Sequence, residues 1–138
     1  MLRLANGAAC VLQAAELTGD GHREHLQRIA GSGALLVLTS SRLDALGHAL
    51  PSEFCGASLP AHNLDHTGIG HLAIDPPVSG MIGNSTTLVG ERSGSLADYA
   101  TRLLRIAKLL PAVLLARLPS RDADKLQRIC DEHNIILI

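Results

Sequence analysis

The sequence predicts an α/β fold with three layers, in which helices cover both faces of a mixed β-sheet. Unbroken apolar runs of strand length occur at 34–38 and 112–118, and each is followed by a capped segment with helical periodicity. Near the start, Asn6-Gly7 separates two short apolar stretches, a pattern typical of a tight β-hairpin. The length of 138 residues suffices for one domain with a substantial core, so residues 1–138 are expected to form a single domain.

The first elements follow from local signals. The hairpin is expected to pair residues 2–4 with 8–12, because a tight hairpin turn needs a positive φ at both of its positions, which Asn and Gly can adopt. Apolar residues spaced three and four apart then predict a helix over 22–30, with Asp20 as its N-cap and Gly31 as its C-terminal stop.

The next run, 34–38, is apolar throughout, as expected of a strand that is covered on both faces. Ser40 or Ser41 is the expected N-cap of a short helix that ends at Gly47.

The middle of the chain carries weaker signals. Prolines interrupt residues 48–92, and only one or two turns of helix are predicted there, within 64–73. From 78 to 94 the chain is rich in Gly, Ser, Thr and Asn. A loop of this length inside a compact domain is usually functional or disordered.

The clearest helix is expected to begin after Ser95, which forms an acidic variant of the capping box with Asp98. It is expected to run from 96 to 110 and to end before Pro111. Its predicted inner face consists of apolar residues at spacings of three and four: Leu96, Tyr99, Ala100, Leu103, Ile106, Ala107 and Leu110.

A second buried strand is predicted over 112–118, followed by a helix with Ser120 as N-cap and Asp122 in its first turn. Asn134 is the expected helix stop, and 135–138 the last strand. Because the sequence stops within an apolar strand, we expect the chain to be the N-terminal domain of a longer protein.

Composition argues against several classes of function. The net charge is −1, and Phe54 and Tyr99 are the only Phe, Tyr or Trp residues, so no nucleic-acid partner is expected. No apolar run approaches the roughly 20 residues of a membrane span, so no membrane partner is expected. Three widely spaced cysteines fit a reducing compartment, and a cytoplasmic location is expected.

Segment 90–95 is the candidate anion site. It runs into the predicted helix N-terminus, where backbone N–H groups and the helix dipole favour negative charge. The predicted phosphate-binding residues are Arg92, Ser93, Gly94 and Ser95. The hydroxyl-rich stretch 80–87 lacks the lysine of a P-loop, so a nucleoside triphosphate is not indicated. The alternative is an ordinary capped helix after a loop.

A second candidate is the histidine-rich segment 55–75, where a His-x3-His spacing is compatible with zinc. The ligands it offers are Cys55, His62, Asp65, His66, His71 and Asp75. There is no Cys-x2-Cys pair, and little regular structure is predicted, so a polar loop rich in His is the favoured interpretation and no metal ligand is predicted. No nucleophile motif is present, and no catalytic residue is predicted.

Three stretches together resemble 3,4-dihydroxy-2-butanone 4-phosphate synthase of riboflavin biosynthesis. Val11–Glu16 is similar to the family strand that ends in Ala-Glu, and Gly31–Gly47 to its Gly-x-Gly, apolar strand and Thr-Glu-x-Arg sequence. Leu109–Asn134 resembles its Pro-Ala-Gly-Val strand, the helix after it and a closing Lys-His-Asn turn. The resemblance implies a shortened synthase-like fold.

The residues that this resemblance would make catalytic are replaced. The last six positions of the family's acidic loop, Asp-Arg-Glu-Asn-Glu-Gly-Asp, fall on residues 5–10, which hold no carboxylate and no arginine. Arg92 and Gly94 match two positions of the family's Arg-x-Gly-His-Thr-Glu, whose other named residues are lost. The family's late catalytic Glu falls on Arg117. Magnesium binding and proton transfer depend on such acids.

The resemblance therefore implies a catalytically degenerate synthase-like domain of a riboflavin biosynthesis protein, without a cofactor and with a structural or oligomeric role. The family's active enzymes are homodimers, so a homodimer is expected, with the apolar helix 96–110 as a candidate interface. Residues 103–112 are similar to shortened domains that are fused ahead of GTP cyclohydrolase II, which implies a downstream domain of that kind.

Two alternatives stay open. The first is an active Mg²⁺-dependent lyase that converts ribulose 5-phosphate to 3,4-dihydroxy-2-butanone 4-phosphate and formate. In that case Arg92 and Ser95 would hold the phosphate, and Glu16, His71 or Asp75 would serve as metal or proton groups. The second is a small-molecule or metal-binding module that uses segment 55–75.

Overall fold

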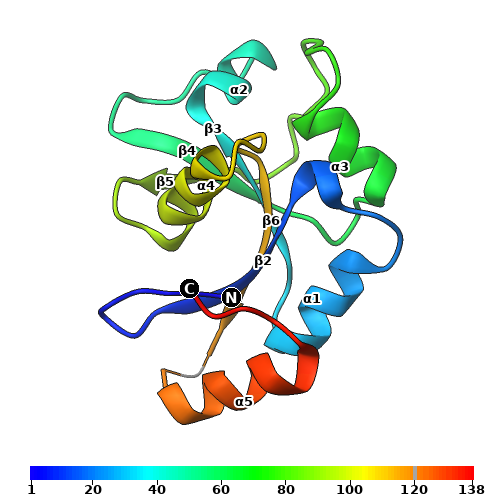
Figure 1. Ribbon diagram of the computed structural model, residues 1–138. Coiled ribbons are helices and arrows are strands. Elements are labelled where there is room, and N and C mark those ends of the chain that lie inside the picture. Colours follow the sequence, from blue (N-terminus) through cyan, green and yellow to red (C-terminus); the bar gives the residue numbers. More distant parts are fainter. Residues whose placement is uncertain (120) are drawn as a thin grey trace.

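The computed structural model describes residues 1–119 and 121–138, and within them it shows a mixed α/β fold with a curled six-stranded sheet (Figure 1). The strands are β1 (Leu2–Arg3), β2 (Ala9–Ala14), β3 (Leu35–Thr39), β4 (Phe54–Pro60), β5 (Val89–Arg92) and β6 (Val113–Leu118). The α-helices are α1 (His22–Ala30), α2 (Ser40–Ala45), α3 (His66–Ala73), α4 (Leu96–Ile106) and α5 (Ala123–His133), with a short 3-10 helix, η1, at Ala15–Leu17.

The order of strands in the sheet is β1-β2-β6-β3-β4-β5, and every strand pairing in the described residues is antiparallel. The predicted mixed sheet is therefore wrong. The physical reason is the position of β6, which inserts between β2 and β3. Helix α1 connects β2 to β3, which would be parallel neighbours, but β6 runs antiparallel to both and separates them.

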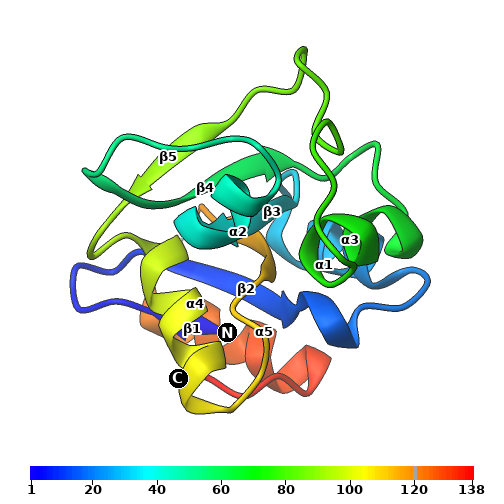
Figure 2. The ribbon, with the colours of Figure 1, turned by 90° about the horizontal axis from the view of Figure 1, so that it is seen from above.

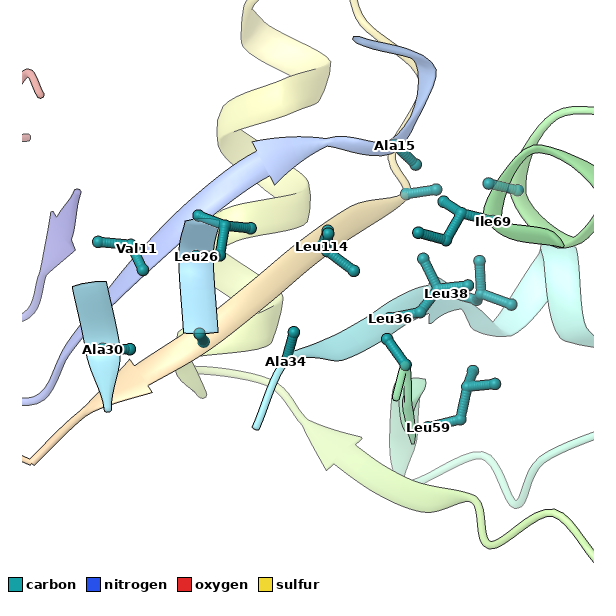
Figure 3. Packing of buried hydrophobic residues seen from close by; sticks show 14 of the residues in the cluster. Val11, Ala15, Leu26, Ala30, Ala34, Leu36, Leu38, Leu59, Ile69 and Leu114 are labelled. Carbon is teal, nitrogen blue, oxygen red and sulfur yellow. The ribbon is translucent and has the colours of Figure 1, made fainter. Parts of the chain in front are cut away.

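Alternation along the central strands sends side chains to two separate apolar clusters. Leu36 and Leu114 belong to the larger cluster, which also contains residues of α1, α3 and α5. Figure 3 shows part of this cluster, with Ile69 of α3 beside Leu38 of β3. Val37, which lies between Leu36 and Leu38 in the chain, joins the smaller cluster, which is formed with α4. Apolar residues on both sides of the central strands explain the unbroken apolar runs in the sequence.

Helices therefore lie against both faces of the sheet. Helix α4 packs on β2, β3 and β6 through the smaller cluster, and α1 packs on β2 and β6 from the side of the larger one. Helices α1 and α5 lie near one another (Figure 1), and the rings of His25 and His133 meet edge to face with centroids 5.7 Å apart.

The N-terminal hairpin is confirmed, because Leu2 pairs with Cys10 and Arg3 with Ala9. The expected turn is wrong in detail: of Asn6 and Gly7 only Gly7 has a positive φ, and the loop spans residues 5–7 between the paired Leu4 and Ala8. Helix α1 also has the predicted bounds and ends at Gly31, which adopts the left-handed conformation with φ 65°.

Two predicted N-caps are wrong. Gly21, and not Asp20, occupies the cap of α1, and the Asp20 carboxylate lies 2.6 Å from the His66 imidazole instead. Helix α2 is capped by Thr39, whose Oγ1 accepts from the Arg42 N–H at 3.3 Å, and not by Ser40 or Ser41.

The middle of the chain is more ordered than its sequence indicates. It holds β4 and β5, which were not predicted, and α3, which was predicted only as one or two turns. Asp65 caps α3 by accepting from the Gly68 N–H at 2.7 Å.

Two arginines hold the middle of the chain in place by donating to its backbone carbonyls. Arg23 donates to the carbonyls of Ala61, His62 and Leu64, and Arg42 to those of His71, Leu72 and Asp75.

Helix α4 begins after Ser95, as predicted, and Ser95 Oγ accepts from the Asp98 N–H at 3.2 Å. It ends at Ile106 and not at residue 110, because the chain turns at Lys108 with φ 59°. The predicted inner face is only partly right. The buried residues of α4 are Leu96, Ala97, Asp98, Ala100, Thr101 and Leu104, whereas Tyr99 and Ile106 are 44% and 80% exposed.

Helix α5 is capped by Asp122, and the predicted cap Ser120 lies outside the described residues. Asn134 ends the helix in the left-handed conformation, as predicted. Residues 135–138 are not a strand of the sheet. They run beside the first residues of the chain, where Ile138 O accepts from the Arg3 N–H at 3.1 Å and the Ile138 N–H donates to Met1 O at 2.9 Å.

Candidate functional site

Three segments that the resemblance links to catalysis lie close together on the α4 side of the sheet. Cys10, the last residue of the segment that the resemblance aligns with the family's acidic loop, is the register partner of Arg117 on β6. The Arg117 guanidinium lies 3.2 Å from Glu91 Oε1 on β5. Glu91 immediately precedes Arg92, the first of the predicted phosphate-binding residues. The fold therefore brings together residues that are about a hundred positions apart.

Glu91 and Asp98 are the two acids of this region that are buried, and each has 6% of its surface exposed. Glu91 Oε1 accepts from Ser58 Oγ at 2.9 Å and from Arg117 Nη2 at 3.2 Å. We call these three residues, Ser58, Glu91 and Arg117, the Glu91 cluster. A buried carboxylate needs such partners, since an unpaired buried charge is strongly destabilising. Both partners use the same oxygen, and the charge of Glu91 is balanced within the fold.

The predicted phosphate loop is occupied by a carboxylate of its own chain. Asp98, one turn into α4, accepts from the Gly94 N–H at 2.8 Å and from Ser93 Oγ at 3.4 Å. Burial by itself would raise the pKa of Asp98, but the hydrogen bonds from Gly94 and Arg102 outweigh it, and the pKa lies below its ordinary value of 3.8. The Asp98 carboxylate thus takes the place at the helix N-terminus where an anion is stabilised.

The cations around this loop also have partners. Arg102 Nε donates to Asp98 Oδ1 at 3.0 Å, and its Nη2 donates to Ser93 Oγ at 3.1 Å. Arg92 turns outward, with Nη2 3.6 Å from Glu53 and its guanidinium carbon 5.5 Å from the centre of the Phe54 ring. Phosphate binding by Arg92, Ser93, Gly94 and Ser95 stays a prediction, and a phosphate there would compete with the Asp98 carboxylate for the Gly94 N–H.

Residues 5–10, which the resemblance aligns with the family's acidic loop, do not fit a magnesium ion. Asn6 is the one carboxamide among residues 5–10, and the Asn6 side-chain oxygen accepts from the Ala8 N–H at 3.0 Å within the turn. Cys10 is fully buried, and desolvation raises the pKa of its thiol to about 11, so it is neutral at pH 7. Mg²⁺ prefers charged oxygen ligands, and these side chains supply none.

The acids and bases of the active-lyase alternative are not gathered at this site. Glu16 Oε1 accepts from the Leu110 N–H at 3.0 Å, beyond the end of α4. His71 and Asp75 pair with each other at the end of α3. Helix α3 contributes its buried residues to the larger apolar cluster, on the face of the sheet opposite α4.

The histidine-rich segment does not converge either. His66 pairs with Asp20, and His71 with Asp75. The Cys55 thiol donates to the Glu91 carbonyl at 3.1 Å, on the α4 side. In the part of the chain that the structure describes, no three His, Cys, Asp or Glu side chains form a group able to hold a metal ion.

Comparison with protein-family models and with curated proteins finds no match to this chain.

Sequence reasoning missed Glu91 and Ser58. Glu91 was part of the loop 90–95 but was given no role, and Ser58 lies on a strand that was not predicted. The available signal was weak: in the short sequence Val-Gly-Glu-Arg, a single Glu follows a Gly.

Among residues 1–119 and 121–138, no helix has the length and apolar character needed to cross a membrane.

Proposed function

We propose that this chain is a catalytically degenerate 3,4-dihydroxy-2-butanone 4-phosphate synthase-like domain of a riboflavin biosynthesis protein, with a structural and oligomeric role. The arrangement of helices on the two faces of the sheet would then be a shortened form of the three-layer synthase fold. A downstream GTP cyclohydrolase II domain and a cytoplasmic location belong to the same proposal.

The observation that carries the proposal is the pairing of Arg117 with Glu91. Arg117 occupies the position of the family's late catalytic Glu, and its guanidinium balances the buried Glu91 carboxylate. A general acid or base must exchange its proton with a substrate. Glu91 instead accepts two hydrogen bonds from its own chain, so it serves the fold.

The hairpin supports the same proposal. Residues 5–10 form the turn and the start of β2, and they contribute a buried thiol where the family has carboxylates. A lyase that depends on Mg²⁺ needs oxygen ligands at these positions.

The oligomeric part of the proposal is supported by α4. Tyr99 and Ile106 are exposed, and Leu103 between them is half-buried, so the outer side of the helix presents an apolar stripe at spacings of four and three. Such a stripe is typical of a helix that packs against another one. A second copy of this chain, in an antiparallel contact of the two α4 helices, is the proposed partner.

Activity is tested by incubating the protein with ribulose 5-phosphate and Mg²⁺ and measuring formate, with an active synthase as the positive control. We expect no formate above the protein-free background. Turnover that increases with protein concentration would overturn the degenerate assignment and favour the lyase alternative.

Oligomeric state is tested by sedimentation velocity on the unmodified chain and on Ile106→Glu. We expect a dimer that Ile106→Glu converts to a monomer, because a charge buried in an apolar contact has no partner there. The matched control is Ile136→Glu, since Ile136 is 79% exposed but is remote from α4 in the sequence. A monomer at every concentration would remove the oligomeric part and leave the catalytic part to the formate assay.

A further inference from the structure

A cavity of about 360 Å³ lies on the face of the sheet opposite α4, between the end of β4, α3 and the loop that precedes β5. Its lining residues include Leu59 of β4 and Leu72 of α3, which belong to the larger apolar cluster. The Glu91 cluster and α4 are on the other face. The cavity is thus separate from the site discussed above.

A long loop contributes half of the lining residues of this cavity: Met81, Ile82, Gly83, Ser85, Thr86 and Thr87. It spans 74–88 between α3 and β5, and Figure 2 shows it projecting between these two elements. Ile82 is 2% exposed and anchors the loop in the larger cluster, and the Ile82 carbonyl lies 3.3 Å from His48 Nε2. Long connections without regular structure inside a compact domain are commonly binding loops. An anchored loop beside a cavity fits that role.

Part of the cavity lining is apolar. Leu59, Leu64, Leu72, Met81 and Ile82 provide it. Methionine adapts its shape to irregular or flat ligands more readily than branched residues do. These side chains suit contact with the face of a ring.

Another part of the lining is polar. It consists of His62, the Asn63 carboxamide and the hydroxyls of Ser85, Thr86 and Thr87. Among the described residues, no Asp, Glu, Lys or Arg lines the cavity. A phosphate or carboxylate that enters the cavity would lose part of its hydration without gaining a cation from the lining, which is unfavourable.

We propose that this cavity binds an uncharged nitrogen heterocycle of nucleoside size. Its volume lies within the range of about 300–1,000 Å³ that small-molecule sites occupy. The Asn63 carboxamide offers a donor and an acceptor side by side, which match the edge of a purine. A free sugar fits less well, because its hydroxyls would face leucine and methionine side chains without partners.

This binding activity goes beyond the proposed function and does not depend on it. The test uses adenosine as the probe, with guanosine and uridine as further nucleosides, and detects binding to the full chain by saturation-transfer NMR and by calorimetry. We expect adenosine to bind with a Kd in the millimolar range or tighter. Adenosine 5′-monophosphate should bind at least about tenfold more weakly, since the site has no cation for its phosphate.

Two variants locate the site. Asn63→Ala should weaken adenosine binding about tenfold, as expected from the loss of paired hydrogen bonds. Ser41→Ala, in a different cavity of about 340 Å³, should leave binding unchanged. The melting temperature of each variant shows that it is folded.

The proposal is overturned if none of the three nucleosides binds at about 5 mM. It is also overturned if the monophosphate binds as tightly as adenosine, or if Asn63→Ala folds and binds normally. None of these outcomes bears on formate production, so this inference and the proposed function fail independently.

Discussion

Arg117 on β6 and Glu91 on β5 are 3.2 Å apart, although β3 and β4 lie between their strands in the sheet. The curl of the sheet and the length of the arginine side chain make this contact possible. The ion pair joins β6 to β5 across the α4 side of the curled sheet. Its loss should therefore affect the stability of the fold and not only the local surface.

The first prediction concerns this pair. Arg117→Ala leaves the buried Glu91 carboxylate with the Ser58 hydroxyl, and we expect the free energy of unfolding to fall by about 1–3 kcal/mol. The expected loss in the free energy of unfolding is modest, because the Arg117 side chain is itself half exposed. Urea denaturation measures it, and a double-mutant cycle with Glu91→Ala isolates the pair.

Arg92→Ala is the matched control, because the Arg92–Glu53 pair is exposed and 3.6 Å apart. That change should alter stability by no more than about 0.5 kcal/mol. Equal effects of the two substitutions would contradict the structural role of the Glu91 cluster.

The second prediction is a pH dependence that arises from Asp98. Its pKa is lower in the folded chain than the ordinary value of 3.8, so the unfolded chain binds the proton more tightly. The stability that Asp98 contributes is therefore present above about pH 5 and is lost as the pH falls through 3.8 towards the folded pKa. Asp98→Asn should be less stable than the unmodified chain at pH 7, and the difference should shrink at pH 3.

Urea denaturation over this pH range measures the effect. The control is Asp44→Asn, since Asp44 is an exposed residue of α2. A stability difference for Asp98→Asn that does not change with pH would show that its hydrogen bonds do not favour the charged form.

The third prediction separates the two sides of α4. Leu104 is 4% exposed and packs in the smaller apolar cluster, so Leu104→Ala should cost about 2–4 kcal/mol. Ile106 is 80% exposed, and Ile106→Ala should change monomer stability by less than about 0.5 kcal/mol. Thermal and urea unfolding at low protein concentration give both values. The reverse order would favour the inner face that periodicity alone predicts.

The fourth prediction concerns the thiols. Cys10 and Cys130 are buried, and burial raises the pKa of Cys10 to about 11, so neither should react with a thiol reagent in the native chain at pH 8. Cys55 is partly exposed and should react first, although slowly, because burial and the nearby Asp98 charge raise the pKa of the Cys55 thiol. In urea all three should react. Rapid native modification of Cys10 would contradict the packing of β2 against α4.

Hydrophobic periodicity, together with Gly, Pro and helix-capping residues, predicted two kinds of element. These are strands that are apolar on both faces and helices that are clearly amphipathic. The buried strands β3 and β6, and helices α1 and α5, were found in this way, because their burial repeats along the sequence. The direction of the strands was missed, since the insertion of β6 between β2 and β3 is a long-range choice that no local pattern encodes.

Strands β4 and β5 were missed for a different reason. Gly56 lies within β4, and a Cβ there would clash with the Leu38 carbonyl oxygen, so the close approach of the two backbones requires glycine. Gly90 in β5 lies under the Phe54 ring, and a Cβ on Gly90 would lie 2.6 Å from carbon atoms of that ring. Glycine weakens the strand pattern in the sequence, although the close tertiary contacts at these two positions require glycine.

The inner face of α4 was predicted only in part for a similar reason. Small residues, Ala97, Ala100 and Thr101, let the helix approach the sheet, whereas the larger Tyr99 and Ile106 point outward. A search for large apolar residues therefore selects the wrong stripe. The segments of the candidate site were named from the resemblance, but their contacts through Glu91 and Ser58 depend on the unpredicted strands.

The central claim is that the site has lost lyase chemistry, and the most direct measurement follows ¹³C-labelled ribulose 5-phosphate by NMR in the presence of Mg²⁺ and the full chain. The account predicts that the sugar phosphate remains unchanged and that no formate signal appears while an active synthase consumes the same substrate. A formate signal that grows with protein concentration and disappears when the Mg²⁺ is chelated would contradict it.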